Sequence, residues 1–141
     1  MRSKLNNIHD ETTLIFVYGS LKRGYRNEAF LYEAKSLGKA KTLKKYPLIV
    51  NKNEYYPYLI NKKGFGHEII GELYRIKKDC LIELDRFEAT EFKRQKIKVQ
   101  KKSVRQISST SNELIEAYTY YYNKEINYNN YELSWAWSRK D

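Results

Sequence analysis

Residues 14–24 (LIFVYGSLKRG) join a buried-strand pattern to a glycine break, an arrangement that can bind an anion. Residues 14–18 are apolar, β-branched or aromatic, a composition typical of a buried strand. Gly19 and Ser20 then interrupt the strand, and the chain turns polar. Backbone N–H groups released at such a break can converge on an anion, and glycine permits the close approach and positive φ angles that this requires. The stretch therefore predicts an anion-holding loop, with an ordinary turn as the alternative.

One carboxylate, Glu88, extends a predicted apolar helix face. Asp79 can cap a helix whose apolar residues share one side, namely Cys80, Leu81, Leu84 and Phe87. Glu88 follows Leu84 by one helical turn and so projects on the same side. Burying a carboxylate among apolar groups costs free energy, so a carboxylate at this position is predicted to have a specific role. That role is acid–base chemistry or a structural ion pair, for which Arg94 or a nearby lysine would be the partner.

The other reactive side chains are weaker candidates. Cys80, the single cysteine, is predicted to be a small core residue and not a nucleophile. The two histidines, His9 and His67, fall in the polar N-terminus and at a strand start, which leaves little for a zinc site or a Cys–His dyad. Ser20 lacks the second glycine of a nucleophile elbow. Asp85 is predicted to be a surface or structural carboxylate, and we expect no metal site.

The composition indicates one folded domain. A chain of 141 residues with 41% hydrophobic and 15% aromatic residues can bury a core. It has no apolar run long enough to span a membrane, and its N-terminus lacks a signal-peptide pattern. The single cysteine fits a reducing compartment, so we expect a cytoplasmic location. The net charge of +10 comes largely from lysines scattered in short groups, which favours a solvated basic surface over a nucleic-acid-binding face.

Local patterns predict many strands and few helices. Residues 1–13 are expected to be a flexible lead-in and residues 14–141 a single domain. Strands are predicted at residues 14–18, 39–43, 46–50, 55–60, 68–76, 93–101 and 114–122, with a short apolar segment at 131–137. Helices are predicted at residues 27–34, ended by Gly38, and at 79–87. Gly71 is expected to mark a bulge or a close backbone approach. The fold class is therefore α+β, a compact, mixed, largely antiparallel β-barrel with a few short helices.

Five short motifs follow one another along residues 14–137. They are Val-Tyr-Gly-Ser-Leu-Lys-Arg-Gly at 17–24, Tyr-Pro-Leu-Ile at 46–49, Gly-Glu-Leu-Tyr at 71–74, Leu-Asp-Arg-Phe-Glu at 84–88 and Phe-Lys-Arg at 92–94. Each is weak alone, but five in this order are specific. Together they resemble the γ-glutamyl cyclotransferase-like family, which carries a Tyr-Gly-Ser/Thr-Leu loop after its first strand. Within that family the chain is most similar to the γ-glutamylamine cyclotransferases.

The resemblance implies a barrel with a cavity at one end, a small-molecule γ-glutamyl substrate and no metal or organic cofactor. By this likeness Glu88 takes the family's catalytic acid–base position. The loop that holds the glutamyl group would consist of Tyr18, Gly19, Ser20 and Leu21. Residues that would line or support the cavity are Arg94, Tyr118 and Tyr120, with core packing an equal alternative for the two tyrosines. The chain departs from the family pattern at Phe92, where tyrosine is more usual, and at its C-terminal Trp-Ala-Trp.

A γ-glutamyl amide carries its own nucleophile, since its α-amine can attack the γ-carbonyl and close a 5-oxoproline ring. Intramolecular attack can remove about 7–11 kcal/mol of the barrier. One carboxyl group can take the proton from the α-ammonium and return it to the departing amine, so Glu88 is predicted to act as general base and then as general acid. Its apolar neighbours would raise its pKa. The loop amides would hold either the α-carboxylate or the developing oxyanion.

Two further functions fit the same residues. A basic domain with Tyr118, Tyr120 and Tyr122 at alternate strand positions could stack single-stranded bases, although Glu88 would oppose this electrostatically. The fold could also sense a ligand without turning it over. Three kinds of released amine are compatible with the sequence: a lysine side chain from a degraded cross-link, a free amino acid, or a biosynthetic intermediate.

Overall fold

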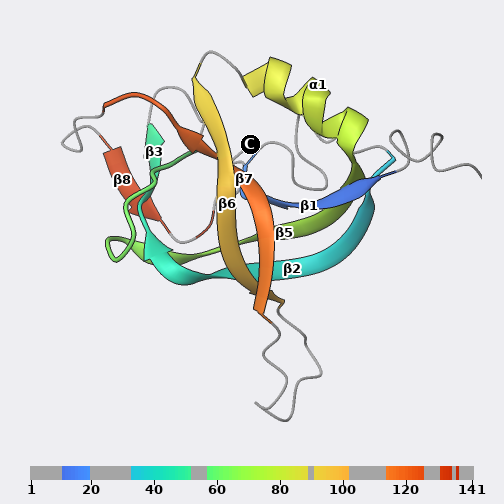
Figure 1. Ribbon diagram of the computed structural model, residues 1–141. Coiled ribbons are helices and arrows are strands. Elements are labelled where there is room, and N and C mark those ends of the chain that lie inside the picture. The colour runs from blue at the N-terminus through green and yellow to red at the C-terminus, as the bar shows by residue number, and fades with distance from the viewer. Residues whose placement is uncertain are drawn as a thin grey trace, which may run out of the picture.

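The computed structural model describes residues 11–19, 33–51, 57–88, 91–101, 114–125, 131–134 and 136 (Figure 1). In chain order its elements are β1 (Thr12–Val17), β2 (Lys35–Tyr46), β3 (Leu48–Asn51), β4 (Pro57–Leu59), β5 (His67–Lys77), α1 (Lys78–Glu88), β6 (Phe92–Lys101), β7 (Leu114–Tyr122) and β8 (Tyr131–Ser134). β1 begins inside the predicted lead-in of residues 1–13. The helix predicted at 27–34 falls mostly outside the described residues. Within the described ranges, no helix has the length and apolar character needed to cross a membrane.

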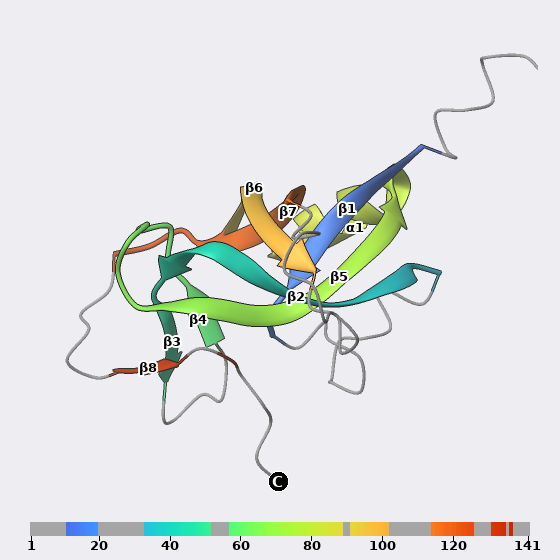
Figure 2. The same cartoon turned by 90° about the horizontal axis from the view of Figure 1, so that it is seen from below.

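Five strands close a barrel in the order β1-β5-β2-β6-β7. Neighbouring strands pair antiparallel, except that β1 and β7 pair in parallel where Ile15 lies opposite Tyr118. A second sheet, in the order β4-β3-β8, lies beside one end of the barrel (Figure 2). The predicted fold, a mixed and largely antiparallel barrel, is confirmed.

β1 is buried on both faces. Phe16 and Tyr18 point into the barrel, where they pack with core residues of the other strands. Ile15 and Val17 point outward and are covered by α1, which lies across the outside of the barrel (Figure 1). A strand buried on both faces needs apolar side chains at every position, which explains the unbroken apolar run in the sequence.

α1 packs on the barrel through Leu81 and Leu84, which are both buried. Its start at Lys78 places Asp79 in the first helical turn and not at the cap. The prediction that Phe87 belongs to the apolar face is wrong, since its side chain is 45% exposed. At roughly 100° per residue, Phe87 lies to one side of the stripe formed by the two leucines.

Gly38 does not end a helix as predicted, because it lies inside β2. The register against β5 shifts between Ser36 and Gly38, which is typical of a β-bulge, and the glycine has a φ of 94°. A bulge and a helix C-terminus can both require a positive φ, so a glycine by itself does not distinguish them.

Gly71 lies where the backbones of two strands approach each other closely, which is one of the two roles predicted for it. A Cβ atom at this position of β5 would lie 2.3 Å from the Val17 carbonyl oxygen and 2.7 Å from the Phe16 ring. The missing side chain therefore lets β5 and the end of β1 pack tightly, just before β1 leads into the predicted loop.

Replacing Gly71 by alanine should destabilise the protein by about 2–3 kcal/mol, because the new methyl group overpacks the contact with β1. Urea unfolding followed by circular dichroism would measure this. Gly64→Ala is a suitable control, because its φ of 91° is strained for alanine but nothing lies within 4 Å of the added atom. The control should cost about 1 kcal/mol. Equal losses for the two variants would contradict the steric explanation.

Candidate active site

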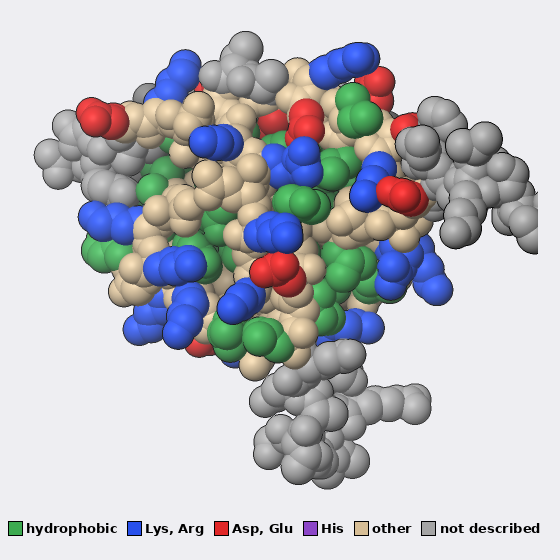
Figure 3. Space-filling model, in the orientation of Figure 1, with side chains coloured by type: hydrophobic (Ala, Val, Ile, Leu, Met, Phe, Trp, Pro, Cys, Tyr) green, Lys and Arg blue, Asp and Glu red, His purple; other side chains and the backbone are tan. Residues whose placement is uncertain are grey.

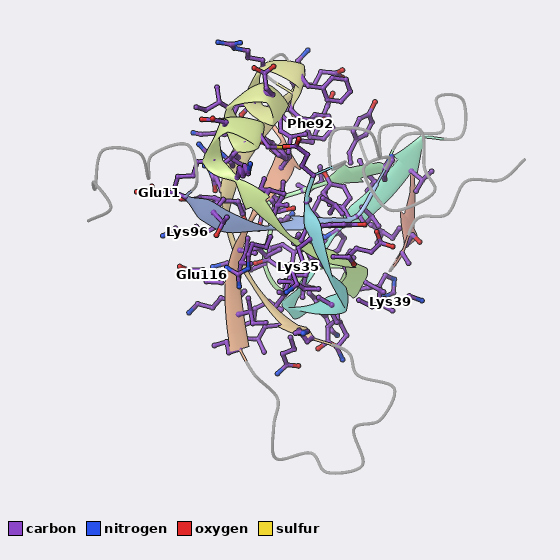
Figure 4. The ribbon with its side chains drawn as sticks, turned by 90° about the vertical axis from the view of Figure 1, so that its right-hand side faces the viewer. Glu11, Lys35, Lys39, Phe92, Lys96 and Glu116 are labelled. Atoms are coloured by element: carbon purple, nitrogen blue, oxygen red, sulfur yellow. The ribbon has the colours of Figure 1, made fainter. Side chains whose placement is uncertain are left out.

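Glu88 is the last residue of α1 and lies, partly buried, at the junction between the helix and the barrel. Its main-chain oxygen accepts a hydrogen bond of 3.2 Å from the Glu91 N–H, which turns the chain into β6. Phe92, the first residue of β6, lies beside the helix (Figure 4). The side of the helix on which Glu88 was predicted to project is the side that faces the barrel.

The surroundings of Glu88 favour its protonated form. Burial, and after it the nearby negative charge of Glu91, raises the pKa of Glu88 from 4.5 to about 7. Among the described residues, no side chain pairs with or donates a hydrogen bond to this carboxylate. Arg94, the predicted partner in the structural alternative, pairs with Asp85 instead.

Tyr18, the residue directly after β1, lies near Glu88. Its phenol donates a 2.5 Å hydrogen bond to the main-chain carbonyl of Tyr120 in β7. Burial raises the pKa of Tyr18, the charge of Glu88 raises it as well, and a backbone hydrogen bond from Leu59 acts against both. The fold thus brings together the predicted catalytic acid and the strand end that leads into the predicted loop. The Tyr18 side chain is buried in the core, and its main chain leads into the predicted loop.

Gly19 packs against the first residue of β4. A Cβ atom there would lie 2.9 Å from Cγ of Pro57. The described glycines with a positive φ are Gly38, Gly64 and Gly66, so of the two properties that glycine permits, Gly19 uses the close approach. Ser20 and Leu21, the other predicted loop residues, lie outside the described residues.

The three predicted cavity or support residues belong to one cluster with Asp85. Asp85 Oδ1 accepts hydrogen bonds from Arg94 Nε at 3.0 Å and from the Tyr120 hydroxyl at 2.7 Å. The Arg94 guanidinium lies 4.6 Å from the ring centroid of Tyr118, a cation–π distance. The cluster therefore joins α1 to β6 and β7. Asp85, predicted to be a surface or structural carboxylate, has a structural role here. Sequence reasoning did not predict its partners, although its position three residues before Glu88 places both on neighbouring parts of the helix surface.

Three aromatic rings connect the second sheet to the barrel near this site. The Tyr58 ring of β4 lies 4.4 Å from that of Tyr122 in β7 and 6.0 Å from that of Phe92, centroid to centroid. Phe92 and Tyr122 meet edge to face at 5.8 Å. Pro57 of the same strand contacts Gly19. β4 therefore touches both the residue that follows Tyr18 and the start of β6.

The described part of the chain contains no group of three or more His, Cys, Asp or Glu side chains arranged to hold a metal ion. Burial and the carboxylates of Glu33 and Glu83 raise the pKa of the Cys80 thiol, which disfavours the thiolate that a nucleophile would need.

Known proteins resemble this chain in both sequence and fold. A gamma-glutamylaminecyclotransferase of Bos taurus is 39% identical over 80 residues, which cover 53% of this chain and 48% of that protein. The chain likewise spans about half the length of other curated relatives that it matches. A putative gamma-glutamylcyclotransferase of Methanocaldococcus jannaschii is 34% identical over 111 residues, covering 77% of this chain and 82% of that protein.

The crystal structure of an AIG2-like protein from Mus musculus has a TM-score of 0.76 and 25% identity, over 91% of this chain and 89% of that one. The model of the family described as "Gamma-glutamyl cyclotransferase, AIG2-like" matches residues 15–139, which include the barrel, α1 and the second sheet. The chain therefore belongs to the gamma-glutamyl cyclotransferase, AIG2-like family.

Proposed function

We propose that this chain is a γ-glutamyl cyclotransferase that acts on γ-glutamylamines and releases 5-oxoproline and an amine. The observation that carries the proposal is the position of Glu88, a partly buried carboxylate with a pKa of about 7 beside the end of β1. Relatives that are named gamma-glutamylaminecyclotransferases support the substrate class. We place the reaction in the cytoplasm because a single cysteine fits a reducing compartment.

In the proposed reaction Glu88 transfers protons between the two nitrogens. Its carboxylate takes a proton from the substrate α-ammonium, and the free amine then attacks the γ-carbonyl carbon to form the ring C–N bond. The carboxylic acid gives this proton to the departing nitrogen as the original amide bond breaks. The ring nitrogen loses its second proton through the regenerated carboxylate to the released amine, which leaves as an ammonium ion. A pKa near 7 supports this cycle, because both forms of Glu88 are then accessible near neutral pH.

The segment after Tyr18 would hold the substrate through main-chain N–H groups. Such groups can bind the α-carboxylate or the oxyanion that develops on the γ-carbonyl. The contact between Gly19 and Pro57 is the described contact that supports the position of this segment, at the residue directly after Tyr18.

The contacts of the tyrosines favour this function over stacking of single-stranded bases. The Tyr118 ring is covered by Arg94, Tyr120 is 5% exposed, and the Tyr122 ring packs on Tyr58. These rings have partners within the protein, so less of their faces is left for bases.

The charges of the barrel surface favour the same conclusion. Lys41 pairs with Glu68 at 3.1 Å, and Lys96 pairs with Glu116 at 3.5 Å (Figure 4). On the face shown in Figure 3, basic side chains are interspersed with apolar and acidic ones. A phosphate backbone is bound more strongly by cations that are gathered and unpaired.

Replacing Glu88 by glutamine should lower kcat by about 10²–10⁴-fold, because the amide can neither take nor return the proton. Release of 5-oxoproline from γ-glutamyl-ε-lysine and a small panel of γ-glutamyl amides would measure this. Glu83→Gln, on an exposed part of the same helix, is the matched control and should stay close to wild type. Cyclisation by the Glu88→Gln protein at near the wild-type rate would disprove the catalytic role.

The stability of the same variant checks the environment of Glu88. The raised pKa means that its protonated form stabilises the fold fully below pH 4.5, and that this contribution is lost as the pH rises through about 7. At pH 8 the glutamine variant should therefore be more stable than wild type, by about 1–2 kcal/mol after allowance for partial exposure. A lower melting temperature at pH 8 would argue against a buried, raised-pKa carboxylate.

The pH dependence of kcat/KM should show an acid limb with a midpoint near pH 7, because the carboxylate form of Glu88 is needed for the first step. Glu91→Gln should move this limb to lower pH, since it removes a negative charge that raises the Glu88 pKa. Glu116→Gln, on the outer face of β7, should leave the limb unchanged. A limb that moves to higher pH in Glu91→Gln would refute the assignment.

Gly19→Ala should raise KM by roughly tenfold, because the added methyl group displaces the loop from Pro57. The protein should remain folded, since the contact lies at the end of the barrel. Adding Pro57→Ala removes the ring atom that the methyl group meets and should recover part of the loss. Steady-state kinetics on the single and double variants would decide this, and a double variant no better than Gly19→Ala would count against the proposed contact.

A further inference from the structure

Asp85 lies three residues before Glu88, near the C-terminal end of α1, and one of its carboxylate oxygens accepts two hydrogen bonds. Its Oδ1 accepts both the Arg94 Nε–H of β6 and the Tyr120 hydroxyl of β7, at 3.0 and 2.7 Å. All three side chains are at least partly buried, so these charge-assisted hydrogen bonds are worth more than an exposed ion pair. The helix end that carries Glu88 is thus tied to two barrel strands.

Tyr120 connects this cluster to the other half of the candidate site. Its hydroxyl donates to Asp85, and its main-chain carbonyl accepts the hydrogen bond from the Tyr18 hydroxyl. The contacts therefore run from α1 through β7 to the end of β1. A shift of the helix end relative to β7 would change the distance between Glu88 and the strand end after Tyr18.

The cluster also determines where the Arg94 charge acts. The guanidinium of Arg94 is engaged by Asp85 and lies over the Tyr118 ring. An arginine beside Glu88 would stabilise its carboxylate and lower its pKa. The ionisable groups that do face Glu88 are Glu91 from the turn before β6, Tyr18 directly after β1 and Tyr120 from β7. With Arg94 held elsewhere, the described groups around Glu88 include no paired cation.

We propose that Asp85 is a positioning residue, which holds the end of α1 against Tyr120 and keeps Arg94 away from Glu88. This inference rests on the proposed function, since it explains how Glu88 keeps both its place and its proton affinity. Asp85 itself need not touch the substrate.

The test compares Asp85→Asn and Tyr120→Phe with the control Glu83→Gln in the full chain. Asp85→Asn should lower kcat by about tenfold with KM within about threefold, because the helix end loses its register on β7. It should also lower the Glu88 pKa by about one unit, since the charges of Arg94 and Glu88 both act on Tyr120 and the freed guanidinium would be able to turn towards the carboxylate. Tyr120→Phe, which keeps the ring and the main-chain carbonyl, should lower kcat with a smaller pKa change. The pKa is read from the side-chain carboxyl carbon of Glu88 by ¹³C NMR.

A second variant separates positioning from a general loss of stability. Asp85→Asn/Arg94→Gln removes the freed cation, so the Glu88 pKa should return towards 7 although the fold gains no contact. A purely structural role would lower the melting temperature and leave the Glu88 pKa where it is. The proposal is overturned if Asp85→Asn leaves that pKa unchanged, or, should that variant not fold, if Tyr120→Phe keeps both kcat and the pKa at wild-type values. If the wild-type protein releases no 5-oxoproline, the proposed function fails, and the NMR titrations still decide the role of Asp85.

Discussion

The apolar strand β1 must be shielded from water on both faces, and this requirement determines how the barrel and α1 pack. Phe16 and Tyr18 fill the barrel, and Ile15 and Val17 must be covered from outside. α1 provides that cover, because Leu81 and Leu84 form its apolar stripe. The same packing brings the C-terminal end of α1 to the end of β1. The candidate site is thus a consequence of how one apolar strand is shielded from water.

The packing that covers β1 also creates the chemistry of Glu88. The contacts that bury the helix stripe desolvate the carboxyl group that extends it, and this raises its pKa to about 7. An ionised carboxylate at this position disfavours the folded state at neutral pH, so Glu88 lowers the free energy of unfolding there. Such a cost is typical of functional positions, where a stable core and a reactive group compete for the same environment.

Tyrosine supplies most of the connections between the elements of the site. Tyr18 and Tyr120 each place a ring in a buried cluster and reach a polar partner on another strand or helix with the hydroxyl. The ring of Tyr118 makes a cation–π contact with Arg94, and the ring of Tyr58 packs on Tyr122 and so joins β4 to the barrel. A phenol suits these roles because it combines a large apolar surface with one hydrogen-bonding group at its far end. These four tyrosines therefore connect elements within the protein.

Local sequence patterns were enough to predict the features that depend on neighbouring residues along the chain. The continuous apolar run before Gly19 predicted a buried strand, the helical spacing placed Glu88 beside Leu84, and the ordered motifs predicted the family and the barrel. The close approach at Gly71 was one of two roles predicted for it, because glycine weakens a strand interior and is typical there of a bulge or of tight backbone packing.

Which distant residues meet depends on how the strands and the helix are arranged in space. Arg94 could pair with any acid that folding brought near, and the barrel brought Asp85. Gly38 could end a helix or form a bulge until β5 lay beside it. The contact of Gly19 with Pro57 and the bond from Tyr18 to Tyr120 join segments that no local pattern connects. Side-chain periodicity reports the face on which a residue lies, whereas strand order and register determine what that face touches.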